Sequence, residues 1–187
     1  QSAQLTVTQA MLDDPPVEPA VPVTFIAFDF STQSNDATVG TSTLSRCPSF
    51  TGSYNYNTSE RSVSTTAWDG GVGTKFWQIT FSAEGYENLQ LFSQQKASNT
   101  GPRDFQVQVQ VDGGEWTNVG DLVVLANDVF VSGVIDGLAL PASCNGAASV
   151  SVRWVVASDT SVGGQLIQAA GSSRIRDIRV DGVPLAP

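Results

Sequence analysis

The chain has 187 residues, and its 9 basic and 18 acidic residues give a formal net charge of −9. This balance excludes the basic clusters that bind nucleic-acid phosphates, so we expect no nucleic-acid partner. The sequence contains no histidine, which excludes a Ser-His-Asp triad, a Cys-His pair and a histidine-ligated zinc site. No run of 18 apolar residues occurs, and we therefore expect no membrane insertion.

The first predicted element is a strand over residues 4–12. Its Thr6, Thr8 and Ala10 share one parity, and the opposite parity carries the apolar residues Leu5, Val7 and Met11. This period-two alternation is typical of a half-buried strand.

A proline-rich linker follows the predicted strand. Residues 13–22 hold four of the nine prolines of the chain. Prolines remove backbone donors and favour an extended, semi-rigid spacer of ~3.1 Å per residue. We therefore divide the chain into a strand-like tail over residues 1–12, a linker over 13–22 and a domain over 23–187.

Strand signals recur through the domain, and no segment keeps helical periodicity over three turns. In DFQVQVQV, which starts at Asp104, apolar residues alternate with glutamines, and the following DGG predicts a tight hairpin. In RIRDIRV the apolar parity shifts, which predicts a β-bulge near Asp177. Seven or eight strands without crossover helices predict an all-β, antiparallel sandwich of jelly-roll type, with first and last core strands over residues 23–30 and 174–180.

Three stretches carry a family resemblance: FWQITFSAEGYENLQLFSQQKASNTGPRDFQVQVQVDGGEWTNV, SVRWVVASDT and SSRIRDIRVDG. They resemble the jelly-roll module repeated in large secreted bacterial surface proteins, which accompanies nuclease, lamin-tail and adhesion-like domains. The module is similar in outline to galactose-binding-like carbohydrate-binding modules. The resemblance covers residues 23–185 and implies this fold. It implies no activity, because a fold does not fix a function.

The two cysteines, Cys47 and Cys144, predict a single disulfide that closes a long loop. A disulfide would indicate an oxidising environment, and with the resemblance it leads us to expect an extracellular or cell-surface protein. Two separate buried thiols are the alternative.

The sequence predicts no enzyme. Two carboxylates suffice for glycoside hydrolysis, and Glu84 and Glu87 in the turn SAEGYEN are the pair that such a reaction would use. We interpret them as a solvated charge pair on a turn.

The segment SYNYNTSERSVSTTAWDGG offers candidate glycan-binding residues, namely Tyr54, Tyr56 and Trp68. Aromatic faces beside amide and hydroxyl groups are a common means of holding a sugar ring. The alternative is that these rings cover an edge of the sandwich.

A Ca²⁺ site is the one cofactor that the resemblance suggests. Carbohydrate-binding jelly rolls often hold a structural calcium where the first and last core strands meet, and the corresponding positions are Asp29 and Asp177. Hard cations prefer such carboxylate oxygens. The alternative is an ion pair between Asp177 and a neighbouring arginine: Arg174, Arg176 or Arg179.

Three interpretations remain for residues 4–12. The segment could pair with an edge of its own sheet, act as a spacer in a larger chain, or complete the sheet of a neighbouring copy, as donor strands do. The third needs an acceptor edge. LVVLANDVFV carries one charged residue, Asp128, and its exposed-edge candidates are Leu122, Val124, Val129 and Val131.

These observations favour a non-catalytic extracellular surface protein. We expect it to assemble with copies of itself into a filament or surface polymer by donating its N-terminal strand. The alternative is a carbohydrate-binding or adhesion module that works as a monomer.

Overall fold

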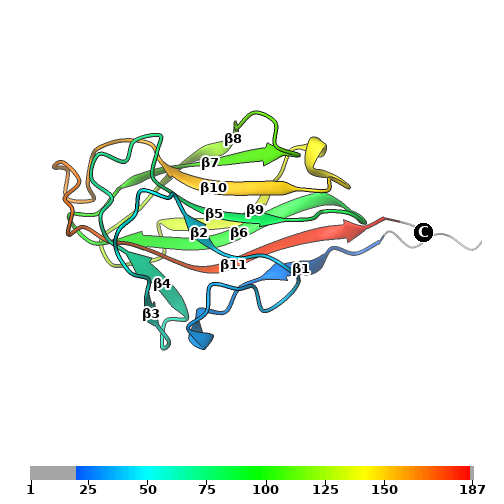
Figure 1. The fold of residues 1–187 in the computed structure, drawn as a ribbon, viewed down its shortest axis with the longest axis horizontal. Coiled ribbons are helices and arrows are strands. Elements are labelled where there is room, and N and C mark those ends of the chain that lie inside the picture. Colours follow the sequence, from blue (N-terminus) through cyan, green and yellow to red (C-terminus); the bar gives the residue numbers. More distant parts are fainter. Residues whose placement is uncertain (1–19, 186–187) are drawn as a thin grey trace, which may run out of the picture.

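The computed structural model describes residues 20–185 and shows two packed β-sheets (Figure 1). The predicted donor residues Leu5, Val7 and Met11 lie outside this range, so what the sequence predicts for them stays a prediction. None of the helical segments in the described range is long and apolar enough to cross a membrane.

Sheet A contains both ends of the described chain. Its strand order is β3-β4-β11-β6-β9, and β1 also pairs with β11. The strands are β1 (Val23–Ala27), β3 (Asn55–Asn57), β4 (Ser62–Thr65), β6 (Tyr86–Ala97), β9 (Gly133–Ala139) and β11 (Ser173–Pro184).

Sheet B has the order β2-β5-β10-β7-β8. Its strands are β2 (Ser45–Arg46), β5 (Phe76–Phe81), β7 (Asp104–Val111), β8 (Thr117–Val124) and β10 (Val150–Val156). Two short 3₁₀ segments, η2 (Phe30–Thr32) and η3 (Ala142–Cys144), complete the described elements.

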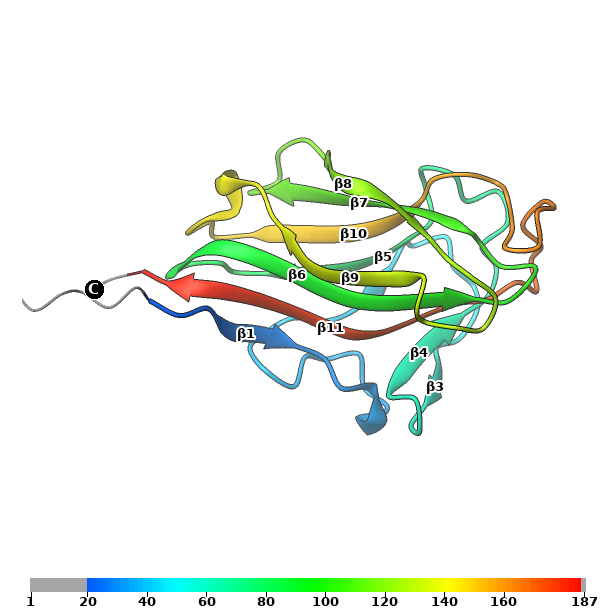
Figure 2. The same ribbon diagram turned by 180° about the vertical axis from the view of Figure 1, so that it is seen from behind.

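The connections between strands are those of a jelly roll. From β4 to β11 the chain changes sheet at every step except the β7–β8 hairpin (Figure 2). The strands named above pair with one another in the antiparallel direction throughout residues 20–185. The predicted fold class is therefore confirmed.

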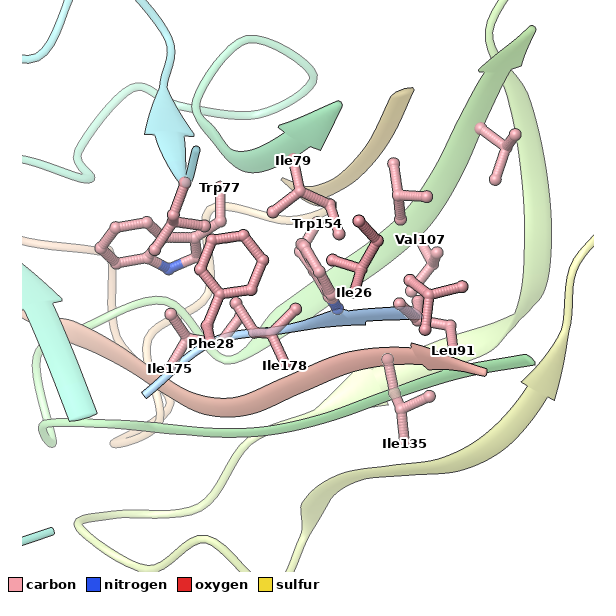
Figure 3. Close-up of a cluster of buried hydrophobic side chains, with 14 of the residues drawn as sticks. Ile26, Phe28, Trp77, Ile79, Leu91, Val107, Ile135, Trp154, Ile175 and Ile178 are labelled. Atoms are coloured by element: carbon pink, nitrogen blue, oxygen red, sulfur yellow. The ribbon is translucent and has the colours of Figure 1, made fainter. Parts of the chain in front are cut away.

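The core lies between the sheets and is rich in aromatic side chains. Figure 3 shows residues of sheet B, such as Trp77 and Trp154, above residues of sheet A, such as Ile175 and Ile178. Each of these four side chains is at most 1% exposed. Burying a large apolar side chain stabilises the fold by ~1.5–3 kcal/mol, so this layer is a major source of stability.

Local predictions for the strands hold where alternation was clear. Phe105, Val107 and Val109 of β7 are buried, and the glutamines between them are half-buried. Asp112 and Gly113 have φ angles of 48° and 74°, as a tight hairpin requires.

Two predictions concern the last and first strands of the core, β11 and β1. At the predicted bulge, Asp177 has φ 51° and the pairing of β11 with β6 skips from Arg176 to Arg179. The strand predicted over residues 23–30 ends at Ala27, because the carboxylate of Asp29 accepts the backbone N–H of Ser31 and starts η2.

The predicted disulfide is wrong, since Cys47 and Cys144 are both free and buried. Cys47 follows Arg46, which pairs with Trp77 at the start of β5. Cys144 lies in η3, whose neighbour Ala147 accepts the backbone N–H of Ala83, beyond the other end of β5. The length of that strand, roughly 3.4 Å per residue, exceeds the ~7 Å limit between bridged Cα atoms.

Candidate functional site

The predicted glycan-binding loop does not present Trp68 to solvent. Trp68 is 0% exposed, and its ring packs against Trp77 and Phe105 with centroids 5.5 Å from each. Its indole N–H donates to the carbonyl of Thr65 at 2.9 Å. The assignment of Trp68 to a glycan site is therefore wrong, because the ring is part of the core.

The two tyrosines of the same loop lie at the edge of the sandwich and are half-buried. The hydroxyl of Tyr54 donates to the carbonyl of Leu44 at 3.3 Å, and the guanidinium of Arg46 lies 3.9 Å from the centre of its ring. The hydroxyl of Tyr56 donates to Asn35 Oδ1 at 2.9 Å, and burial raises its pKa. Their role in glycan binding stays a prediction.

The residues predicted to hold Ca²⁺, Asp29 and Asp177, lie near each other, but the carboxylate of each is already paired with an arginine. Both oxygens of Asp29 accept hydrogen bonds from Arg61, at 3.0 and 2.7 Å, and these bonds lower the pKa of Asp29 to about 2. Asp177 lies 3.3 Å from Arg176, which matches the alternative interpretation.

Ca²⁺ takes six to eight oxygen ligands, and the described residues do not fit that requirement at this place. Within residues 20–185 no group of three or more His, Cys, Asp or Glu residues could hold a metal ion. Asp29 and Asp177 are therefore better described as charges that neutralise Arg61 and Arg176.

The carboxylates considered for hydrolysis lie on the turn between β5 and β6. Glu84 is exposed, and its backbone N–H donates to Ser82 Oγ at 3.2 Å. Glu87 is half-buried at the start of β6, where it pairs with Val183. Neither carboxylate is buried, whereas the general acid of a glycosidase lies in a desolvated pocket.

The outer face of sheet B, by contrast, carries a continuous row of polar side chains. The cross-strand register aligns one residue from each of its five strands. We call this set the polar row: Ser45, Gln78, Arg153, Gln108 and Asn118. All five are half-buried or exposed, because the alternate positions of the strands point into the core.

Hydrogen bonds connect the central members of the polar row. Arg153 Nε donates to Gln108 Oε1 at 2.8 Å, and Gln108 Nε2 donates to Asn118 Oδ1 at 2.8 Å. These bonds fix the orientation of the two amides, since Gln108 uses both its oxygen and its nitrogen and Asn118 uses its oxygen. The row is therefore ordered before any ligand arrives.

A second row of hydroxyl and amide groups runs beside the first. Thr80, Ser151 and Gln110 are aligned across β5, β10 and β7. The hydroxyls of Thr80 and Ser151 are 2.7 Å apart, and Gln110 Nε2 donates to the carbonyl of Gly114. The face thus presents paired donors and acceptors over several strands.

Aromatic rings hold the guanidinium of Arg153 in place. Its central carbon lies 4.0 Å from the ring centre of Trp116 and 5.1 Å from that of Phe76. Both rings are half-buried at the border of the polar row. Cation–π attraction to such rings is worth ~0.5–2 kcal/mol and restricts the side chain.

Arg153 differs from most other arginines in the described range because no carboxylate is paired with it. The ion pairs within residues 20–185 place a carboxylate within 4.0 Å of Arg61, Arg103, Arg174, Arg176 and Arg179, but none beside Arg153. Its hydrogen bond in this range uses Nε, so both terminal amino groups remain for a ligand. Burial lowers its pKa, yet an arginine stays protonated.

The outer face of sheet A is charged and internally paired. Arg174 and Lys96 contact the carboxylate of Glu60, at 3.7 and 2.8 Å. Arg179 lies 3.7 Å from the ring centre of Phe92 and 3.4 Å from Asp181. Because these charges already have partners, this face has less capacity to bind a new ligand.

The predicted acceptor edge is solvent-accessible. Leu122 is 51% exposed, Val124 48%, Val129 46% and Val131 80%. Leu122 and Val124 belong to β8, the last strand of sheet B, and Val129 and Val131 lie in the connection to β9. The structure thus leaves these residues open to a partner without showing one.

Sequence reasoning missed the polar row. The alternation of glutamines with apolar residues in β7 predicts a strand but no site, and the sequence pattern does not single out Arg153 or Trp116. Three glutamines of one parity in a single strand were the available signal. The alignment with Arg153 needs the register of β10 against β7, which the sequence does not provide.

Similarity to known proteins is weak and comes from solved structures. No protein-family model and no curated protein matches the sequence. A solved structure described as "CBM4 structure and function" has 14% identity and a TM-score of 0.45, over 88% of this chain and 95% of that one. The N-terminal cellulose-binding domain of β-1,4-glucanase C from Cellulomonas fimi has 11% identity and a TM-score of 0.37, over 67% of this chain and 80% of that one.

Proposed function

We propose that the protein is a non-catalytic carbohydrate-binding module and that the outer face of sheet B holds the glycan. The observation that supports this most directly is the polar row, which offers amide, hydroxyl and guanidinium groups across five strands. Neighbouring strands are ~4.8 Å apart, so these groups form a regular series along an extended ligand. Sugar hydroxyls both donate and accept hydrogen bonds, as amides do.

The composition of the face favours a neutral glycan over a polyanion. Arg153 is the one cation of the polar row, whereas the other four members are uncharged. Affinity for a nucleic-acid backbone depends on several cations that each neutralise a phosphate. One guanidinium among amides instead suits the orientation of a few sugar hydroxyls or a ring oxygen.

We place this activity outside the cell or at the cell surface, where polysaccharides are accessible. The low fraction of charged residues, 14%, agrees with that location. The buried free thiols do not conflict with it, since burial raises the pKa of Cys144 to about 11 and keeps it unreactive.

Affinity electrophoresis tests the proposal. The full chain should be retarded in gels that contain at least one neutral polysaccharide of a varied panel, and Gln108→Ala should remove most of the retardation. Gln94→Ala on β6 of sheet A is the matched control and should leave it unchanged. Equal mobility of the full chain in every gel would overturn the proposal.

We propose a second function, the assembly of the protein with copies of itself into a filament or surface polymer. The observation that favours it is the open edge of the sandwich at β8, where Leu122 and Val124 are about half exposed. Edge strands are normally protected by charge or by a covering segment. Light scattering after size exclusion should show a mass that grows with protein concentration, and a monomer at every concentration would contradict this function.

A further inference from the structure

We propose that the groove between β8 and β9 receives residues 4–12 of a second copy of the chain as an added strand. This inference rests on self-association, the second function proposed above, and names the segment that fills the edge. The groove has a volume of about 310 Å³ and is lined by both strands, including Leu122, Val124, Val134 and Leu138.

The groove joins the open edges of both sheets. β8 ends sheet B and β9 ends sheet A on the same side of the sandwich (Figure 2). Within residues 20–185 β8 pairs only with β7, and β9 pairs only with β6. Each strand therefore leaves backbone N–H and C=O groups along one side, and an added strand would pair with them.

Exposed apolar residues gather at this edge of the sandwich. Leu122, Val124 and Val134 line the groove and are 45–51% exposed. Val129 and Val131 continue the patch along the connection between the two strands. A contiguous exposed apolar patch of this kind typically marks an interaction site, whereas single scattered apolar residues do not.

Residues 4–12 match the groove in length, pattern and charge. Nine residues in a strand match the eight of β8 and the seven of β9. The apolar parity of the segment can cover the groove while its threonines face water. The segment is uncharged, whereas Asp121 and Asp136 line the groove and would repel the acidic linker that follows.

The route of the chain favours a second copy over the same molecule. β1 lies beside β11, so β11 and β6 separate it from β9. A segment that precedes β1 would have to turn back across these strands, about 14 Å at the usual strand spacing, to reach the groove of its own molecule. Prolines in the linker oppose such a reversal, because they keep the chain extended. A head-to-tail contact of this kind produces a filament when the rotation between copies does not close into a ring.

Two pairs of variants test the inference by light scattering after size exclusion. In the segment, Val7→Asp should reduce the assembled mass to that of a monomer, while Thr8→Asp, on the opposite parity, should leave it unchanged. In the groove, Val124→Asp should abolish assembly, while Thr80→Asp on β5 should not. Circular dichroism establishes that each variant remains folded.

A mixing experiment identifies the donor. One population carries Val7→Cys, on the parity that covers the groove, and the other carries Leu122→Cys, and oxidation of the mixture should give a cross-linked dimer of the two. A cross-link that forms only within single chains carrying both changes would overturn the inference, and so would the absence of any cross-link. Assembly that survives Val7→Asp but is lost in Val124→Asp would overturn the named segment and leave self-association standing. A monomer at all concentrations would overturn both.

Discussion

Arg153 and Gln108 face each other across β10 and β7, and Arg153 Nε donates to Gln108 Oε1 at 2.8 Å. This bond links the one cation of the polar row to a chain of amides that ends at Asn118. The rings of Trp116 and Phe76 hold the guanidinium from its flanks. The geometry is therefore fixed in advance, which reduces the entropy lost when a ligand is bound.

Replacing the guanidinium should weaken glycan binding strongly. Arg153→Ala removes a charged donor and frees the Gln108 amide, and hydrogen bonds to charged groups contribute ~1.5–3 kcal/mol. We expect Kd to rise about 10- to 150-fold, measured by isothermal titration calorimetry with a polysaccharide that retards the wild-type chain. Arg179→Ala, which removes an arginine from the outer face of sheet A, should change Kd less than twofold. Equal effects of the two changes would contradict the assignment.

Trp68→Ala should affect stability and not the ligand site. The ring is fully buried among Trp77, Phe105 and Phe50. Its removal leaves a cavity and should lower the free energy of unfolding by ~3–5 kcal/mol. Denaturant titration followed by circular dichroism measures this loss, and Trp68→Phe should show a smaller one. A variant of unchanged stability that no longer binds glycan would restore Trp68 to the site.

The ion pair between Asp29 and Arg61 should make the stability of the fold depend on pH in the acidic range. Hydrogen bonds from Arg61 lower the pKa of Asp29 from 3.8 to about 2 in the folded state. A carboxyl with a lowered folded pKa stabilises the fold above its unfolded pKa, and this contribution is lost as pH falls from about 4 to about 2. The difference in urea midpoint between wild type and Asp29→Asn should therefore be constant near neutral pH and shrink over that window. A difference that grows on acidification would show that the pair does not act in this way.

The cysteines should behave as two thiols rather than a bridge. Cys47 and Cys144 are free and lie beyond opposite ends of β5. Protein purified without reductant and then unfolded should release two titratable thiols per chain with Ellman's reagent, and reductant should not change its melting temperature. Absence of titratable thiols would contradict the structure at this point.

Sequence periodicity was sufficient to predict the fold class, because a strand with one buried face shows alternating apolar and polar residues in its sequence. The alternation in β7, the hairpin at Asp112 and the bulge at Asp177 follow from local patterns. Trp68 was misassigned because it follows β4 in a loop, where periodicity does not indicate which side of the chain is buried.

The candidate site was less accessible to sequence reasoning because it depends on long-range register. Ser45 and Asn118 join one row only through the pairing of β2 with β5 and of β7 with β8. Of the residues predicted for the acceptor edge, Leu122 and Val124 line the groove, whereas Val134 and Leu138 of β9 come from the other sheet. Contacts between sheets are set by tertiary packing, which a single sequence does not specify.

Nuclear magnetic resonance titration of the full chain with soluble oligosaccharides tests the central claim most directly. The side-chain amides of Gln78 and Gln108, Arg153 Nε–H and the indole N–H of Trp116 report on the outer face of sheet B separately from the rest of the molecule. Binding on this face predicts that these signals shift together and saturate with at least one neutral oligosaccharide, while the amide of Gln94 on sheet A stays in place. Shifts confined to sheet A or to the loop of Tyr54 and Tyr56, or none with any sugar of the panel, would contradict it.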